Sequence, residues 1–376
     1  VPTPCFEGIR GFRMGADGLE EQTCDASASS CDGIARCISD HIDSSSELRL
    51  SDEVEEALDQ HGVSTELLPF LIAIEDKGFA AKCEVPLPPA VRTAALMFMS
   101  HVVQLMHMSR KIWFDAVSLL DAYCILVPGG LETAVLPSLC VATVTIPVKL
   151  DQAGFSSRRA SLSRMTSHLD LWLQTLGFKA LACTEDTIVA MEKSLLETLG
   201  WQINLPSVDS WLSRFCVRLN VITRGLCSSS LDFVLKQSVD YAQHLVLHHA
   251  STVDAPARRM ACGVLTLISA HVGFIPADAL RPPHFSPANW QTLFMMSTPQ
   301  KTVPKCMLNA VQLKRFLTLL EVATGFKLAK IQLDCELVAT LSRDINLRVP
   351  SRQGAVDGSD PRWVRTGPCW MALEPR

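Results

Sequence analysis

Residues 184–215, TEDTIVAMEKSLLETLGWQINLPSVDSWLSRF, are the stretch that decides the fold. Its first half carries apolar side chains in a 3-4-4 spacing, which predicts one buried face of a helix. These side chains are Ile188, Met191, Leu195 and Leu199. Thr184 is a good N-cap for that helix, and the two acids that follow it favour the positive end of the helix dipole. Pro206 stops the helical pattern, and a second short helix is expected over residues 209–219.

Apolar side chains recur at helical spacing on both sides of this stretch, and no convincing series of strands is found. We therefore expect an all-α protein with two helical bundles in succession. The predicted helices before residue 184 cover 90–108, 111–126, 131–149 and 167–177. Those after the stretch cover 229–249, 255–273, 304–322 and 327–346. Residues 281–290 are rich in proline and are expected to form an irregular connection.

The sequence divides into five regions by composition and periodicity. Residues 1–46 are rich in Gly, Ser, Asp and Cys, lack periodicity and are expected to be flexible. Residues 47–85 predict an N-terminal extension of two short helices, and residues 86–215 and 225–346 predict the two bundles. The last region, 347–376, holds four prolines among polar residues and is expected to be disordered.

The overall composition excludes several classes of protein. Of the 376 residues, 48% are hydrophobic and 19% are charged, which is too apolar for a disordered chain and enough for a sizeable core. The net charge is -5, so the chain has no basic excess for general phosphate binding, and a nucleic-acid partner is not expected. The longest uncharged run, between Glu132 and Lys149, contains two prolines and is shorter than the ~20 residues of a membrane-spanning helix. We expect that run to be a helix buried on all sides, and we expect no membrane partner.

The 14 cysteines do not form a recognisable metal site. No CxxC pair occurs, and the cluster of Cys24, Cys31 and Cys37 lacks a fourth ligand at a recognised spacing. The histidines of 244–249 are expected to be surface or half-buried residues, because a third ligand is missing. Four other cysteines lie inside apolar helical patterns and are expected to fill the core: Cys124, Cys140, Cys216 and Cys262. We expect reduced thiols in an intracellular protein, and no metal or cofactor.

The order of residues in 184–215 resembles the end of the N-terminal cyclin box. Cyclins typically show there a Met-Glu pair, apolar residues, a Leu-x-Trp turn, a short extended stretch and a Pro that leads into a helix. The corresponding residues are Met191, Glu192, Leu195, Leu196, Leu199, Trp201, Pro206, Trp211 and Leu212. The resemblance extends loosely over roughly 85–345, and the residues in this stretch are most similar to those of the A/B-type cyclins.

Segments before this stretch resemble earlier helices of the cyclin box. Arg92 stands near the start of the family's first helix, residues 117–123 resemble its second helix, and residues 142–149 resemble its buried third helix. The chain departs from the family at Met97, where an acid is usual, and at 152–168, which lengthens the connection after the third helix. The resemblance implies two tandem cyclin-type five-helix bundles, the second one divergent.

The resemblance also implies roles for individual residues. Lys149 and Glu192 would lie side by side and contact a kinase near its C helix, holding that helix inward. Arg92 and Asp121 would form a buried pair that fixes the register of two helices, since removing one member leaves a buried charge. Phe98 is expected to pack in the core rather than to line a peptide-docking groove.

These roles imply a regulatory subunit that binds and activates a cyclin-dependent Ser/Thr kinase and controls the cell cycle in the nucleus and cytoplasm. Such a subunit has no catalytic residue of its own, and kinase substrates or inhibitors would be its further partners. The segment Arg158-Arg159-Ala160-Ser161 matches a basophilic kinase site, which makes Ser161 a candidate for phosphorylation.

Two other classes of protein remain open on the sequence. A cyclin-fold transcription factor that binds promoter DNA and polymerase would be expected to have a basic face and often a zinc ribbon; the net charge of -5 and the lack of CxxC oppose it. An enzyme with a cysteine nucleophile needs a histidine positioned beside the thiol, and nothing near the cysteines indicates one.

Overall fold

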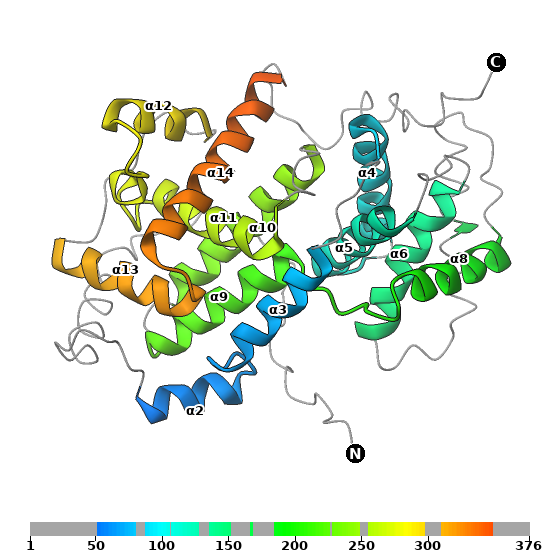
Figure 1. Cartoon of the computed structure of the whole chain (residues 1–376), viewed down its shortest axis with the longest axis horizontal. Helices are drawn as coiled ribbons and strands as arrows, with labels where there is room; N and C mark the ends of the chain where they lie inside the picture. The colour runs from blue at the N-terminus through cyan, green and yellow to red at the C-terminus, as the bar shows by residue number, and fades with distance from the viewer. Residues whose placement is uncertain are drawn as a thin grey trace, which may run out of the picture.

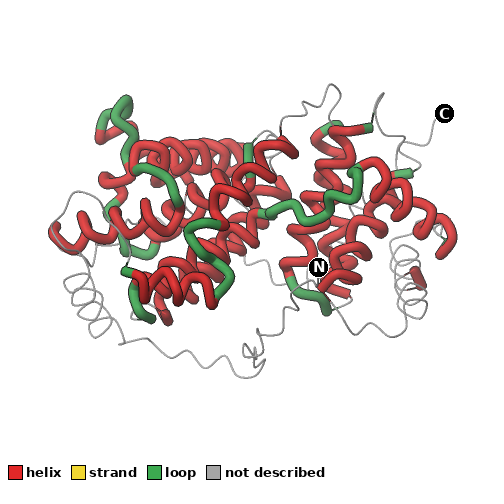
Figure 2. Tube along the Cα trace, turned by 60° about the horizontal axis from the view of Figure 1, so that its bottom comes forward, coloured by secondary structure: helices red, strands yellow, loops and turns green. Residues whose placement is uncertain are grey.

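The computed structural model describes residues 51–79, 87–105, 107–127, 135–151, 166–167, 184–225, 228–248, 255–297 and 310–348. Within these residues the chain forms twelve α-helices and one short 3-10 helix, without a strand, which confirms the all-α class. Figure 2 shows the same: helices and connecting loops make up the whole described part of the chain. The regions 1–46 and 349–376, most of the expected helix 167–177, and Ser161 lie outside the described residues.

The first bundle is built around one helix that is buried on nearly all sides. It consists of α4 (Pro89–Leu105), α5 (Arg110–Leu126), α6 (Leu136–Asp151) and α8 (Glu185–Thr198). The central helix is α6, which packs against α4, α5 and α8 (Figure 1). All its side chains from Leu136 to Val148 are buried except Ser138, because this run contains no charged residue. The helix continues through Pro147 to its last turn.

The second bundle repeats this plan with more helices. It contains α9 (Val208–Ile222), α10 (Ser228–His248), α11 (Ala257–His271), α12 (Pro287–Ser297), α13 (Ala310–Thr324) and α14 (Leu328–Arg348). The central helix is α11, which packs against α9, α10, α14 and the short 3-10 helix η2 (Ala277–Leu280). Gly263 allows α11 to approach α14 closely, because a Cβ at that position would lie 2.2 Å from the carbonyl oxygen of Asp334. Every side chain of α11 from Met260 onward is buried.

The helix that follows the extended stretch joins the two bundles. α9 packs against α10, α11 and α13, and it also contacts α5 of the first bundle. The domain boundary expected after residue 215 falls inside this helix. Figure 1 shows the first bundle on the right and the second on the left, with the connection into α9 between them.

One helix of the second bundle was not predicted. Residues 281–290 were expected to be irregular, but α12 begins at Pro287, so the prediction is wrong from that residue onward. Proline fits the first turn of a helix because its missing N–H would have no partner there. The Ser286 hydroxyl accepts a hydrogen bond from the Asn289 N–H at 3.2 Å and so caps the helix. Trp290 then anchors α12 in the core, where it is fully buried.

Two N-terminal helices, as expected, precede the bundles: α2 (Asp52–Gln60) and α3 (Leu67–Phe79). They are tied to the second bundle by Arg218 of α9, which is 1% exposed. Its guanidinium donates to the carbonyl oxygens of Val63 at 2.6 Å, Ala323 at 2.9 Å and Val322 at 3.1 Å. The last two carbonyls lie at the end of α13 and have no partner within that helix. Arg218 therefore clamps the turn between α2 and α3 to the end of α13.

Candidate functional site

An ion pair joins the end of α6 to α8, and we call it the rim pair. Lys149 lies in the last turn of α6, and its Nζ donates to both carboxylate oxygens of Glu192, at 2.5 Å each. The two residues are 43 positions apart and meet because α6 and α8 pack side by side. The side chain of Glu192 is 10% exposed and that of Lys149 is 29% exposed. The rim pair thus lies at the edge of the first bundle, with the Lys149 side chain more exposed than that of Glu192.

Thr145, one turn before Lys149 on α6, fixes the orientation of the Glu192 carboxylate. The Thr145 hydroxyl is hydrogen-bonded to Oε1 of Glu192 and also lies 3.0 Å from the carbonyl oxygen of Ala142. The Glu192 carboxylate therefore has two partners on α6 and a single orientation. A surface acid with free rotation would have neither constraint.

Exposed apolar side chains lie next to the rim pair in the sequence of both helices. Leu150 follows Lys149 and is 54% exposed, and Val189 lies one turn before Glu192 and is 48% exposed. Exposed apolar side chains at this end of two neighbouring helices present surface that burial against another protein removes from water. This end of the first bundle is therefore a candidate for contact with a partner protein.

The other residues singled out in 184–215 lie on α8 or directly after it, and they pack in the core or end the helix. Leu195 and Leu199 are buried in the core, and Met191 packs against it. Trp201 is 67% exposed and has a positive φ of 63°, directly after Gly200 with a φ of 55°. The Trp201 N–H donates to the Leu196 carbonyl oxygen at 2.9 Å, which closes the end of α8.

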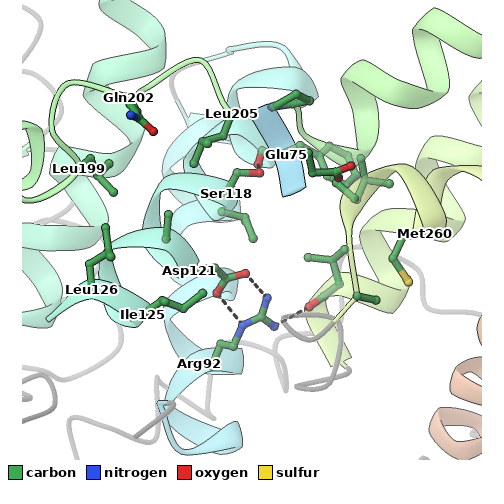
Figure 3. Close-up of a pocket in the computed structure, with 18 residues that line it drawn as sticks. Glu75, Arg92, Ser118, Asp121, Ile125, Leu126, Leu199, Gln202, Leu205 and Met260 are labelled. Atoms are coloured by element: carbon green, nitrogen blue, oxygen red, sulfur yellow. Dashed lines mark hydrogen bonds and ion pairs between the residues drawn. The ribbon is translucent and has the colours of Figure 1, made fainter. Parts of the chain in front are cut away.

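A second ion pair lies between the two bundles, and we call it the seam pair. Arg92 of α4 donates to Asp121 of α5 through Nε at 3.0 Å and through Nη2 at 2.8 Å. Its Nη1 donates to the carbonyl oxygen of Val246 on α10 at 3.0 Å, so one guanidinium holds three helices and both bundles (Figure 3). The Arg92 side chain is 4% exposed, and the neighbouring carboxylate of Asp121 favours its charged form.

The seam pair borders a cavity of about 160 Å³ between the bundles. Pro206 lines it too, from the extended stretch that leads into α9. Sequence reasoning missed another residue of this cavity, Glu75 of α3, which is 6% exposed. A signal was present in the sequence: Glu75 falls on the same helical face as Leu68 and Ile72, where an apolar side chain would be expected.

Other residues that the sequence singled out lie in ordinary surroundings. Phe98 is fully buried, so it packs in the core. The rings of His244 and His248 lie 4.6 Å apart on α10, and burial lowers the pKa of both. Cys140, Cys216 and Cys262 are buried and Cys124 is half-buried.

The described residues contain neither a metal-binding cluster nor a membrane-spanning helix. No group of three or more His, Cys, Asp or Glu side chains in that part of the chain could hold a metal ion. None of its helices is long and apolar enough to cross a membrane. A scan against protein-family models and a search of curated proteins also found no match to this chain.

Proposed function

We propose that this chain is a cyclin-like regulatory subunit with two tandem cyclin-type bundles, which binds and activates a cyclin-dependent Ser/Thr kinase. The observation that carries the proposal is the rim pair. The resemblance in 184–215 implied that Lys149 and Glu192 lie side by side, although 43 residues separate them, and they are paired at 2.5 Å. The rest of the chain supplies the scaffold that holds this pair at the edge of the first bundle.

The surroundings of the rim pair support a contact with a partner rather than a purely internal role. Both carboxylate oxygens of Glu192 accept hydrogen bonds from Lys149. The Lys149 side chain nevertheless stays 29% exposed and can donate to acceptors of another protein. Leu150 and Val189 would lose their exposed apolar surface on binding, which is the favourable term in association. The fixed carboxylate needs no reordering, so little conformational entropy is lost when a partner docks.

Activation would follow from preferential binding to one state of the kinase. A protein kinase needs its strand lysine paired with the glutamate of its C helix before the phosphates are positioned. A subunit that binds only the inward position of that helix raises the population of the competent state by its difference in affinity for the two states. The subunit supplies no reacting group in this scheme, because positioning alone completes the kinase site.

The test is co-purification of kinase activity with the full chain. The tagged chain is incubated with purified cyclin-dependent kinases, and phosphorylation of histone is measured in the bound fraction. We expect kinase activity with the parent chain and a loss of at least about tenfold in Lys149→Glu and in Glu192→Lys. Lys193→Glu is the matched control, because Lys193 is the next residue on α8 and is 75% exposed.

The double variant Lys149→Glu, Glu192→Lys separates an interface role from a structural one. It restores an ion pair inside the chain with reversed polarity, so its melting temperature should return toward that of the parent. Kinase activity should stay low, because the partner meets the charges in the wrong order. Recovery of kinase activity in the double variant would contradict the proposal, as would the absence of bound kinase activity in the parent.

A further inference from the structure

The cavity between the bundles has the size of a site for a small molecule. It is bordered by α3, α4, α5, α10, α11 and the extended stretch before α9, and its volume is about 160 Å³. An apolar cavity of about 150 Å³ inside a protein holds a molecule the size of benzene. This cavity therefore has room for a ligand with one aromatic ring.

Both bundles supply apolar walls to this cavity. Val117 and Ala122 of α5 line it from the first bundle. Val246 of α10 and Ala257 and Met260 of α11 line it from the second. A ring between these walls would be removed from water on both faces, and burial of apolar surface is the main favourable term in such binding.

The first charged pair on the cavity wall, the seam pair, is closed within the protein. Arg92 donates to both oxygens of Asp121, and its Nη1 donates to the carbonyl oxygen of Val246. The pair therefore carries no net charge toward the cavity. A charged ligand would lose its hydration at this wall without gaining a counter-charge, which is unfavourable.

The second charged pair on the wall is formed by Glu75 with Arg258 of α11. Oε1 of Glu75 accepts from the Arg258 backbone N–H at 2.9 Å, and the buried Oε2 lies 3.5 Å from Arg258 Nε, at ion-pair distance. The carboxyl group thus has its counter-charge inside the protein and needs none from a ligand. With both pairs closed, the cavity favours a neutral ligand.

The cavity has an open side and a closed side. Leu126 is 44% exposed and Gln202 is also exposed, whereas Met260 is 1% exposed. Figure 3 shows Leu126 and Gln202 on one side of the cavity and Glu75 with Met260 on the other. A ligand would enter past the end of α5 with its ring toward Met260, and a polar substituent could stay in water at the mouth beside Gln202.

We propose that this cavity binds a small neutral compound with one aromatic ring, which lies between α5 and α11 with any polar substituent at the mouth. Because the ring touches both bundles, the ligand braces them against each other. A ligand that binds only the folded chain also raises its melting temperature in proportion to the logarithm of the ligand concentration. The site is separate from the rim pair, and it stands whether or not the chain binds a kinase.

The test is calorimetric titration of the full chain at neutral pH with phenol, benzylamine and benzoate, which share one ring and differ in charge. Phenol is neutral under these conditions, whereas benzylamine is a cation and benzoate is an anion. We expect saturable binding of phenol and affinities at least about tenfold lower for both ions. Phenol should also raise the melting temperature of the chain, and the two ions should raise it less at the same concentration.

Two variants place the ligand in this cavity, because they fill it from opposite bundles. Ala122→Leu on α5 and Ala257→Leu on α11 should each weaken phenol at least about tenfold while the helical circular dichroism is retained. Ala190→Leu is the matched control, since it adds the same side chain at an exposed position of α8 that does not line the cavity.

The two filling variants are independent, so one that keeps its helical circular dichroism is enough for the comparison. The proposal is overturned if phenol shows no saturable binding to the parent. It is equally overturned if phenol binds a folded filling variant as tightly as it binds Ala190→Leu, or if either ion binds the parent as tightly as phenol does.

Discussion

The two ion pairs have the same chemistry and opposite surroundings. In each, a cation contacts both oxygens of one carboxylate: Arg92 with Asp121 at the seam, and Lys149 with Glu192 at the rim. At the seam, Nη1 of Arg92 also donates to the carbonyl oxygen of Val246 on α10, and Arg92 is 4% exposed. The rim pair joins two helices of one bundle, and Lys149 is 29% exposed.

Under the proposed function, this difference separates residues that hold the chain together from residues that contact a partner. A guanidinium has enough fixed donors to serve three helices at once, and at the seam all of its directions point into the protein. An ammonium on a flexible stem can satisfy one carboxylate and still present a donor to solvent. The seam pair is therefore expected to contribute mainly to the free energy of unfolding, and the rim pair mainly to the binding of a partner protein. The following predictions test that division.

The largest effect is expected at the seam. Asp121→Ala leaves the buried Arg92 without its counter-charge, which should lower the free energy of unfolding by about 3–5 kcal/mol. Chemical denaturation of the two proteins measures it. The double variant Arg92→Met, Asp121→Leu should recover part of the loss, because no buried charge remains. Equal midpoints for Asp121→Ala and the parent would show that the seam pair is not structural.

The next effect is a pH dependence at the cavity beside the seam. The raised pKa of Glu75 means that the folded protein binds more protons than the unfolded chain between pH 4.5 and about 7. The stability due to this group is present below pH 4.5 and is lost as the pH rises through 7. Between pH 5 and pH 8.5 the parent should therefore lose about 2.5 kcal/mol relative to Glu75→Gln.

The measurement is denaturant unfolding of both proteins at the two pH values. Other acids titrate in this range, because burial also raises the pKa of Asp209 to about 6. They are common to both proteins and cancel in the difference. Parallel pH profiles for the parent and Glu75→Gln would show that Glu75 has an ordinary carboxyl group in the folded state.

A smaller change in stability is expected at the rim. Glu192→Ala should lower the free energy of unfolding by only about 1 kcal/mol, because the half-exposed Lys149 can turn into water. Bound kinase activity should nevertheless fall as far as in the charge-reversal variants. If Glu192→Ala destabilises the chain as much as Asp121→Ala does, the division between the two pairs fails.

The smallest change in stability belongs to the apolar side chain beside the rim pair. Leu150 is 54% exposed, so Leu150→Ser should change the free energy of unfolding by less than about 0.5 kcal/mol. Binding of the kinase should weaken severalfold, because the apolar contact area is lost. Val311→Ser on α13 is the control, since Val311 is 62% exposed and lies in the second bundle. An unchanged affinity in Leu150→Ser would show that the kinase does not contact the surface beside the rim pair.

The helices could be predicted where their signal is local. The N-cap at Thr184 is present, since its hydroxyl accepts from the Thr187 N–H at 3.3 Å, and the apolar spacing that follows it forms α8. The prolines of 281–290 predict a break, but Pro287 lies in the first turn of α12, where a helix accepts proline. The uncharged run before Lys149 is the buried central helix that its composition predicted.

The candidate sites depend on contacts that no local pattern contains. The rim pair was expected only through the resemblance to a family, because 43 residues separate its members. Glu75 is buried by α11, and its partner Arg258 is 183 residues away. The exposure of Leu150 was equally hidden, since Leu150 continues the apolar run of its helix, whereas Val189 lies off the stripe formed by Ile188, Met191 and Leu195. Such features follow from how the helices pack, which periodicity alone does not determine.

The clamp formed by Arg218 has a consequence for which substitutions the chain tolerates. Its three strongest acceptors, at Val63, Val322 and Ala323, are main-chain carbonyl oxygens. A substitution at any of these positions replaces the side chain but leaves the oxygen in place. The three hydrogen bonds therefore depend on the identity of Arg218 and on the backbone path at the other positions, and not on which side chains these positions carry.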